Sequence, residues 1–178
     1  MTNASGHGQE MDEARRAAMR AAARRIDRVN EWLHLGGFIP ADEYQRCLDA
    51  GISHVVDLRQ EHELDEGNSP PPAQRLQELG IARRQIPVPN GSPPTVEQLV
   101  EVAGWFESQE ETSTLYVHCG GGFGRAATMT IGLLILEGAR FDEALEQVRQ
   151  VRPEIMLNDE QVTWLRSVET LSQTTSGA

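Results

Sequence analysis

Apolar residues along this chain follow two patterns that alternate with each other. Short apolar runs bounded by Gly, Pro or Asn indicate strands, and longer segments with apolar residues three to four positions apart indicate helices. The first pattern predicts strands at residues 28–37, 52–59, 81–88 and 114–117. The second predicts helices at residues 11–26, 41–50, 73–79, 95–106, 124–137, 141–151 and 159–171.

Helices and strands alternate through short loops, which is typical of an α/β fold with a central, mostly parallel sheet flanked by helices. A chain of 178 residues suits one domain with a single core. We expect residues 1–27 to form an N-terminal extension, disordered over 1–10 and then helical, residues 28–172 to form the domain, and residues 173–178 to form a disordered tail.

Charge and composition narrow the class of protein. The net charge is −11, which disfavours nucleic acid or an anionic membrane as a general partner. The basic residues are all Arg, which is typical of a GC-rich bacterial genome. No apolar run approaches 18 residues, and the N-terminus lacks a signal peptide, so we expect a cytoplasmic enzyme. The Arg-rich helix at 11–26 is interpreted as packing on the domain or as a frayed leader, because its apolar face is mostly Ala and would bind a membrane weakly.

The segment 113–137 is the strongest indication of function in the sequence, STLYVHCGGGFGRAATMTIGLLILE. It has the pattern of a buried strand, a glycine-dense turn and a helix that ends at Gly138. Glycines 120, 121, 122 and 124 allow successive backbone N–H groups to converge on one centre, and the N-terminus of the helix attracts negative charge. This turn therefore predicts an anion site suited to phosphate.

Two side chains in this turn add reactivity. Cys119 enters the loop, and a thiol among N–H groups beside a guanidinium is expected to have a pKa well below the free value of about 8.5. Arg125 leaves the loop and can bind two phosphoryl oxygens at once. His118 precedes the nucleophile and is expected to hold the loop by hydrogen bonds. A nucleotide loop is poorly supported, because no Lys-Ser/Thr follows the glycines.

The second cysteine, Cys47, is far from Cys119 in sequence, so a disulfide framework is not indicated. Cys47 lies in the helical pattern 42–50 and is interpreted as a core residue, with a role as redox partner of Cys119 left open.

The run from His118 to Arg125 resembles the signature loop of the cysteine-dependent protein-tyrosine phosphatase superfamily, in its dual-specificity branch. The segment 32–37 is similar to that family's opening strand, and Arg152-Pro153 followed by Asn158 and Gln161 is similar to its C-terminal segment, so the resemblance covers about residues 29–171. It implies hydrolysis of phosphomonoesters through a phosphocysteine, with no metal and no cofactor. It also implies roles for Cys119 as nucleophile, Arg125 as transition-state stabiliser and His118 as loop support, with phosphate bound by Gly120, Gly121, Gly122, Phe123, Gly124 and Arg125.

Two positions depart from the family pattern. Asn90 stands where the family places the Asp that protonates the leaving group, and an amide cannot supply that proton. Ala126 replaces the Ser or Thr that usually follows the Arg, which implies slow hydrolysis of the phosphocysteine. The residues considered as substitute acids are Glu61, Glu63, Asp65 and Asp57. Asp57 is alternatively interpreted as the partner of Arg59 in a structural ion pair or loop anchor.

Three interpretations stay open at this point. The chain is a phosphatase that uses another acid, or a module that binds phosphorylated partners and hydrolyses them poorly, or an enzyme in which deamidation of Asn90 restores the acid. The default substrate is phosphotyrosine on a protein, with phosphoserine, phosphothreonine and small metabolites open. Residues 120–124 contain no Lys or Arg, which argues against multiply phosphorylated inositides. The sequence leaves the oligomeric state undetermined.

Overall fold

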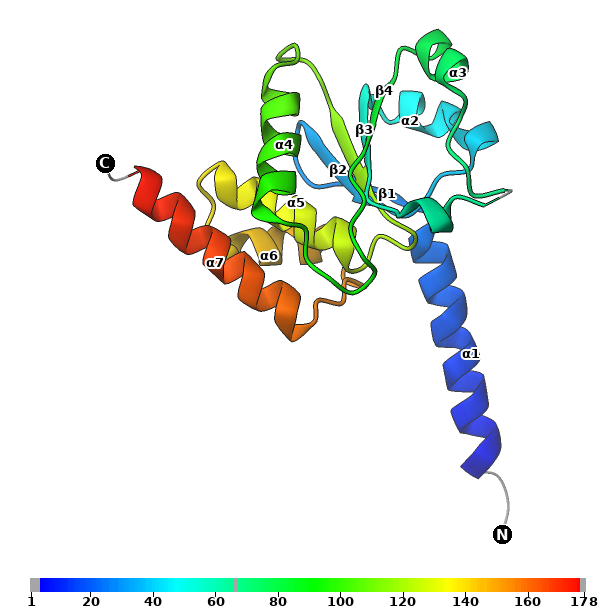
Figure 1. Cartoon of the computed structure of the whole chain (residues 1–178). Helices are drawn as coiled ribbons and strands as arrows, with labels where there is room; N and C mark the ends of the chain where they lie inside the picture. Colours follow the sequence, from blue (N-terminus) through cyan, green and yellow to red (C-terminus); the bar gives the residue numbers. More distant parts are fainter. Residues whose placement is uncertain (1–3, 66, 177–178) are drawn as a thin grey trace.

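The computed structural model describes residues 4–65 and 67–176, with side chains from residue 13 to residue 174. A five-stranded sheet with the order β1-β2-β5-β3-β4 forms the centre of the domain (Figure 1). Only β1–β2 is an antiparallel pair among the described strands; the pairs β2–β5, β5–β3 and β3–β4 are parallel. The predicted α/β fold with a mostly parallel sheet is therefore confirmed. The strand bounds are β1 Ile26–Arg28, β2 Leu33–Gly36, β3 His54–Asp57, β4 Ala82–Gln85 and β5 Leu115–His118.

The three central strands, β2, β5 and β3, are buried at every position. Central strands of a parallel sheet have this pattern because helices cover both faces. The helices are α1 Ala4–Ala23, α2 Gln45–Asp49, α3 Ala73–Glu78, α4 Val96–Glu107, α5 Arg125–Leu136, α6 Phe141–Val151 and α7 Asp159–Ser176, with short 3-10 turns η1 Ala41–Glu43 and η2 Glu61–Glu63. No helix in the described part of the chain is both long enough and apolar enough to cross a bilayer.

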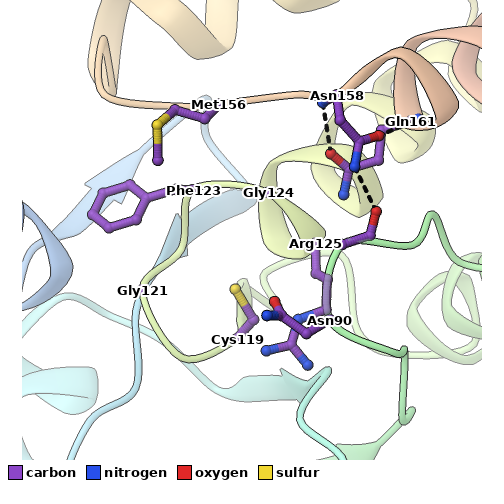
Figure 2. Close-up of a pocket in the computed structure, with 10 residues that line it drawn as sticks. Asn90, Cys119, Gly121, Phe123, Gly124, Arg125, Met156, Asn158 and Gln161 are labelled. Carbon is purple, nitrogen blue, oxygen red and sulfur yellow. Dashed lines mark hydrogen bonds between the residues drawn. The ribbon is translucent and has the colours of Figure 1, made fainter.

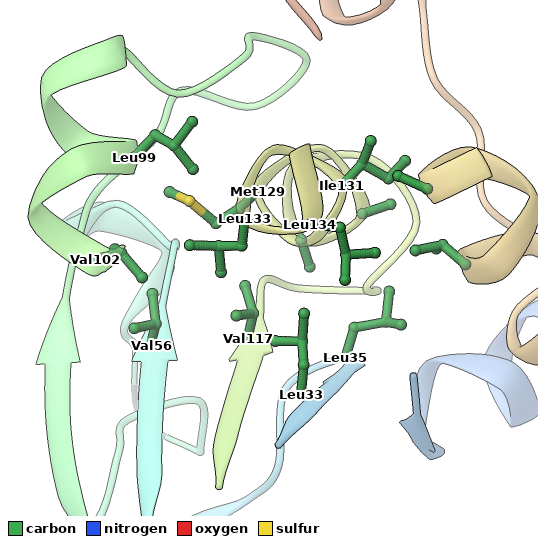
Figure 3. Packing of buried hydrophobic residues seen from close by; sticks show 14 of the residues in the cluster. Leu33, Leu35, Val56, Leu99, Val102, Val117, Met129, Ile131, Leu133 and Leu134 are labelled. Atoms are coloured by element: carbon green, nitrogen blue, oxygen red, sulfur yellow. The ribbon is translucent and has the colours of Figure 1, made fainter. Parts of the chain in front are cut away.

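The larger core lies between the sheet and helices α4 to α7. Figure 3 shows α5 above the sheet, with Leu133 and Leu134 directed toward the apolar side chains of the central strands and Met129 directed toward Leu99 of α4. Residues 125–135 of α5 are all buried, as expected for a helix that is apolar on every side. A smaller cluster covers the opposite face beneath α2 and α3 and includes Tyr116 and Cys47. Cys47 is thus a core residue, as predicted, and burial raises the pKa of its thiol to about 12.

Several predicted boundaries differ from the structure. The sequence pattern places Ile26 in the first helix, but Ile26 begins β1, a three-residue edge strand too short to show a two-residue period. The helix predicted at 41–50 divides into η1 and α2. Helix α1 begins at Ala4, within the stretch 1–10 for which we expected disorder, and α7 continues to Ser176. Residues 1–3 and 177–178 lie outside the described residues. A capping box begins α4, because Thr95 and Gln98 bond to each other's backbone N–H groups.

Candidate active site

The candidate active site lies in the loop that joins β5 to α5. Gly122 has a φ of +75°, and its N–H donates a hydrogen bond to Cys119 Sγ over 3.3 Å. A Cβ atom on Gly122 would lie 2.3 Å from the backbone of Gly36 at the end of β2. Only glycine fits this position without strain, because the backbone is left-handed and another strand lies against it. The loop thus curls tightly and directs an N–H group at the cysteine sulfur.

A cavity of about 260 Å³ opens over the loop. Figure 2 shows Cys119, Arg125 and Asn90 gathered in one part of it, while Asn158 and Gln161 from the start of α7 lie on another side. The side chain of Asn158 donates a hydrogen bond to the Gly91 carbonyl oxygen over 2.7 Å, and this bond fixes the turn that carries Asn90. The lining residues are Asn90, Gly91, Cys119, Gly121, Phe123, Gly124, Arg125, Met156, Asn158 and Gln161.

The guanidinium of Arg125 is held from behind. Its Nη1 and Nη2 atoms donate to the two carboxylate oxygens of Glu63, each over 2.7 Å, and Nη1 also donates to the Val88 carbonyl oxygen over 2.9 Å. A guanidinium has five N–H groups. Among the described residues no acceptor binds Nε–H or the second Nη2–H of Arg125, and these two lie on one edge of the group. That edge can bind two oxygens of a phosphoryl group in parallel.

The carboxylates considered as substitute acids do not line the cavity. Hydrogen bonding from Arg125 holds the pKa of Glu63 below its usual value, so Glu63 is a charged partner of the arginine. Asp57 is buried and accepts from Arg59 and Arg83, each over 2.7 Å. Burial acts to raise the pKa of Asp57, but the nearby His118 and the two arginines outweigh it and lower that pKa. The interpretation of Asp57 and Arg59 as a structural ion pair is therefore correct.

Glu61 and Asp65 are exposed and also lie outside the cavity lining. Asn90, the residue that we expect at the position of the general acid, does line the cavity. No group of three His, Cys, Asp or Glu residues suited to a metal ion is found in the described part of the chain.

His118 is buried directly behind the nucleophile. Its Nδ1 atom lies 3.3 Å from the Cys119 carbonyl oxygen, and its Nε2 atom lies 3.7 Å from Asp57 Oδ2. Burial lowers the pKa of His118 to about 4, so the ring is neutral at physiological pH. Because a carbonyl oxygen only accepts, the contact with Cys119 is a hydrogen bond in the tautomer that carries the proton on Nδ1. These contacts support the predicted role of His118 in holding the loop.

Arg152 is a structural residue of this site whose role the sequence did not reveal. It is fully buried and donates to the carbonyl oxygens of Gly121 and Gly122 in the loop, over 2.7 and 2.9 Å. It also donates to the Ala22 carbonyl oxygen over 2.8 Å and to Asp27 over 2.7 Å. Because C=O and N–H of a trans peptide unit point in opposite directions, binding of these two carbonyl oxygens by Arg152 directs the N–H groups of Gly122 and Phe123 to the other side, and that of Gly122 donates to Cys119 Sγ. The Arg-Pro step was noticed in the sequence, but no local pattern indicates that this arginine is buried.

Residues 39–178 match the family described as Swiss Army Knife protein, DSP-PTPase phosphatase domain. The chain belongs to this family. The predicted resemblance to dual-specificity phosphatases is thereby confirmed, and it includes the loop that carries Cys119 and Arg125.

Individual relatives are more distant. Over 136 residues the chain is 26% identical to the phosphatidylglycerophosphate phosphatase PTPMT2 of Arabidopsis thaliana, covering 76% of this chain and 58% of that protein. The chain thus spans less than two thirds of this relative's length.

Solved structures show the same fold. PTPMT1 superimposes with a TM-score of 0.76 at 21% identity, covering 86% of this chain and 99% of that one. Tk-PTP in its active form superimposes with a TM-score of 0.70 at 26% identity, covering 83% of this chain and 97% of that one.

Proposed function

We propose that this chain is a phosphoric monoester hydrolase that works through a phosphocysteine on Cys119. The observation that carries the proposal is the arrangement of three groups on one cavity. The sulfur of Cys119 accepts the Gly122 N–H, the α5 N-terminus begins at Arg125, and Glu63 holds the Arg125 guanidinium so that one edge remains for a ligand. Each group favours a phosphoryl group at the same point.

In the first step the Cys119 thiolate attacks phosphorus in line with the leaving oxygen. The S–P bond forms while the P–O bond to the leaving group breaks, and that electron pair goes to the leaving oxygen. Loop N–H groups and the two remaining N–H groups of Arg125 bind the other three phosphoryl oxygens. No carboxylate is among the described lining residues, so the leaving oxygen takes its proton from water.

In the second step water attacks phosphorus, the S–P bond breaks, and inorganic phosphate leaves while the water proton passes to solvent. Ala126 offers no hydroxyl to stabilise the departing sulfur. The Gly122 N–H, 3.3 Å from Sγ, is a donor that can partly replace it.

A second candidate function has a specific observation in its favour. Since Asn90 stands at the acid position and no described carboxylate lines the cavity, the protein could bind phosphorylated partners and release phosphate very slowly. General acid catalysis contributes about 10²- to 10⁴-fold, and poor leaving groups depend on it most. Activated aryl phosphates therefore distinguish slow catalysis from capture.

The substrate class is the finer part of the proposal. The sequence favours phosphotyrosine on a protein as the default. The names of the relatives support a phosphorylated lipid headgroup as well, because one is a phosphatidylglycerophosphate phosphatase and PTPMT1 was crystallised in complex with PI(5)P. Both classes are phosphomonoesters, and the chemistry proposed for Cys119 is the same for each.

The test is hydrolysis of p-nitrophenyl phosphate and of an alkyl phosphate by the wild type, Cys119→Ser and Asn90→Asp. We expect the wild type to hydrolyse the aryl ester, and Cys119→Ser to lose this activity. Asn90→Asp should raise alkyl phosphate turnover by at least about 10-fold and add a fall in rate toward alkaline pH, because a carboxyl group must stay protonated to act as the acid. Full activity in Cys119→Ser would refute the mechanism. Tight phosphopeptide binding by a wild type that releases no phosphate would establish the second candidate.

A further inference from the structure

A cluster of arginines lies on α1 in an otherwise acidic protein. Residues 14–25 contain five arginines and no acid, whereas the whole chain has a net charge of −11. Arg15, Arg16 and Arg20 are exposed, and with Met19 and Met156 they line a second hollow of about 370 Å³. Figure 1 shows α1 projecting well beyond the rest of the domain, so these arginines form a basic surface of their own.

This hollow adjoins the catalytic cavity. Met156 lines both and is 55% exposed. The backbone N–H of Met156 donates to the carbonyl oxygen of Phe123 in the catalytic loop over 2.9 Å, and Figure 2 shows the two side chains next to each other. A ligand with its phosphate over the catalytic loop can therefore extend past Met156 toward the arginines of α1.

Buried contacts hold α1 in a defined position relative to the catalytic loop. One guanidinium, that of Arg152, binds the last turn of α1 at Ala22 and the loop carbonyl of Gly121. Arg25, just after the helix, binds both carboxylate oxygens of Glu154 at 2.9 Å. Because Glu154 lies two residues before Met156, the same contacts position both walls of the hollow.

Four of the five arginines of this stretch divide into two groups. Arg24 and Arg25 form ion pairs with Glu43, Asp27 and Glu154 in the domain. Among the side chains that the structure describes, residues 13–65 and 67–174, no carboxylate pairs with Arg15 or Arg20. Their charge can thus act on a ligand in the hollow. A flat membrane is a poorer partner, since the described apolar residues of this helix are alanines and Met19, which lines the hollow.

We infer that Arg15, Arg16 and Arg20 form a second anion subsite, and that the preferred substrate carries a second phosphate group beyond the one that is cleaved. This inference rests on the proposed function. The recognised chemistry is a phosphomonoester joined by a short polyol to another phosphate, whether that phosphate belongs to a soluble bisphosphate or to the diester of a phospholipid. The sequence argument against such ligands considered only residues 120–124, whereas the cations here come from another helix.

The test compares two substrates that differ only in the second phosphate, glycerol 1,3-bisphosphate and glycerol 3-phosphate. The variant is Arg15→Gln with Arg16→Gln and Arg20→Gln. The matched control removes three exposed arginines on α3, α6 and α7, Arg75→Gln with Arg149→Gln and Arg166→Gln, and so changes the net charge equally. p-Nitrophenyl phosphate reports on the chemical step in each protein.

We expect the wild type to prefer the bisphosphate through a lower KM, and the α1 variant to lose about 10-fold in kcat/KM on it, since three exposed charge contacts are removed. The rate of p-nitrophenyl phosphate hydrolysis by the α1 variant should change less than about twofold, and so should kcat/KM of the control variant on the bisphosphate. Equal losses on both glycerol substrates, or the same loss in the control, would overturn the inference. Binding of the wild type and the α1 variant to phosphatidylglycerol vesicles is measured in parallel. If the variant loses only vesicle binding and keeps its kcat/KM on the bisphosphate, the inference is overturned in favour of a membrane surface.

Two further measurements test the subsite without turnover and identify the source of the second phosphate. Calorimetric binding of both glycerol phosphates to Cys119→Ser tests the subsite without turnover, so it remains decisive if the wild type proves inactive. Equal affinity for the two ligands there would refute the subsite. A soluble dioctanoyl lipid with one phosphodiester and one phosphomonoester identifies the source: a preference for it over the bisphosphate, lost in the α1 variant, supports the subsite and assigns the second phosphate to a lipid.

Discussion

Glu63 is the residue through which the orientation of Arg125 can be tested most directly. Its carboxylate accepts two hydrogen bonds of 2.7 Å from the guanidinium, and its side chain is 24% exposed. Glu63→Gln keeps the size of the side chain, removes the charge and replaces one acceptor with an N–H₂ group that cannot accept. The carbonyl oxygens of Val88 and Leu58 would remain as acceptors for Nη1.

The magnitude follows from these contacts. A hydrogen bond to a charged group contributes about 1.5–3 kcal/mol. The remaining carbonyl acceptors and the partial exposure of Glu63 favour the lower end, so about 1.5–2 kcal/mol of transition-state stabilisation should be lost, or roughly 10- to 30-fold in rate. The Glu63 charge partly neutralises Arg125, so removing it should not weaken ground-state binding of a phosphate dianion. The loss should therefore appear in kcat, with KM unchanged or lower.

Steady-state hydrolysis of p-nitrophenyl phosphate measures this split between kcat and KM. Glu61→Gln is the control, because Glu61 lies in the same 3-10 turn with an exposed side chain and outside the cavity lining. A kcat that stays within about twofold of wild type in a folded Glu63→Gln protein, or a loss found entirely in KM, would show that this carboxylate does not orient Arg125.

Three other predictions concern the loop and its support. Gly122→Ala should lower the free energy of unfolding by at least about 3 kcal/mol and Tm by roughly 6–12 °C, because the left-handed backbone and the neighbouring strand exclude a Cβ atom. Gly120→Ala is the control, because a Cβ atom there would meet no atom within 4 Å, and it should change Tm far less. Equal shifts in Tm for the two variants would contradict this account. In urea denaturation, Arg152→Ala should lower the free energy of unfolding by about 3–5 kcal/mol, because it leaves buried carbonyl acceptors unpaired. Arg149→Ala, at an exposed position, should change that free energy by less than about 0.5 kcal/mol. Similar values for both variants would refute the role assigned to Arg152. Burial lowers the pKa of His118 to about 4, so as pH falls below about 6.5 this histidine is protonated in the unfolded chain before it is protonated in the folded one. The free energy of unfolding should therefore decline by up to about 1.4 kcal/mol per pH unit down to about pH 4. In His118→Gln the slope between pH 7 and 4.5 should be shallower, and an unchanged slope would exclude this cause.

Local patterns in the sequence were sufficient for the main elements of the fold. Helices α4, α5 and α6 were predicted within about two residues, because each has a regular apolar face or an uninterrupted apolar run and a clear end such as Gly138. The sequence pattern does not indicate strand β1, because three residues, two half-buried and one exposed, are too few to show a period, and the strand exists only through its pairing with β2.

The amino-acid sequence by itself determined the chemistry of the loop. The spacing of Cys119, the glycines and Arg125 between a strand and a helix defines an anion site, because backbone N–H groups at a helix N-terminus depend on local geometry alone. Tertiary structure decided which other groups reach that loop. Glu63 proved to be the partner of Arg125, Arg152 proved to bind the loop carbonyls, and the arginines of α1 came to lie beside the cavity. These contacts join residues from 30 to more than 100 positions apart, and only the packing of the whole chain can bring such residues together.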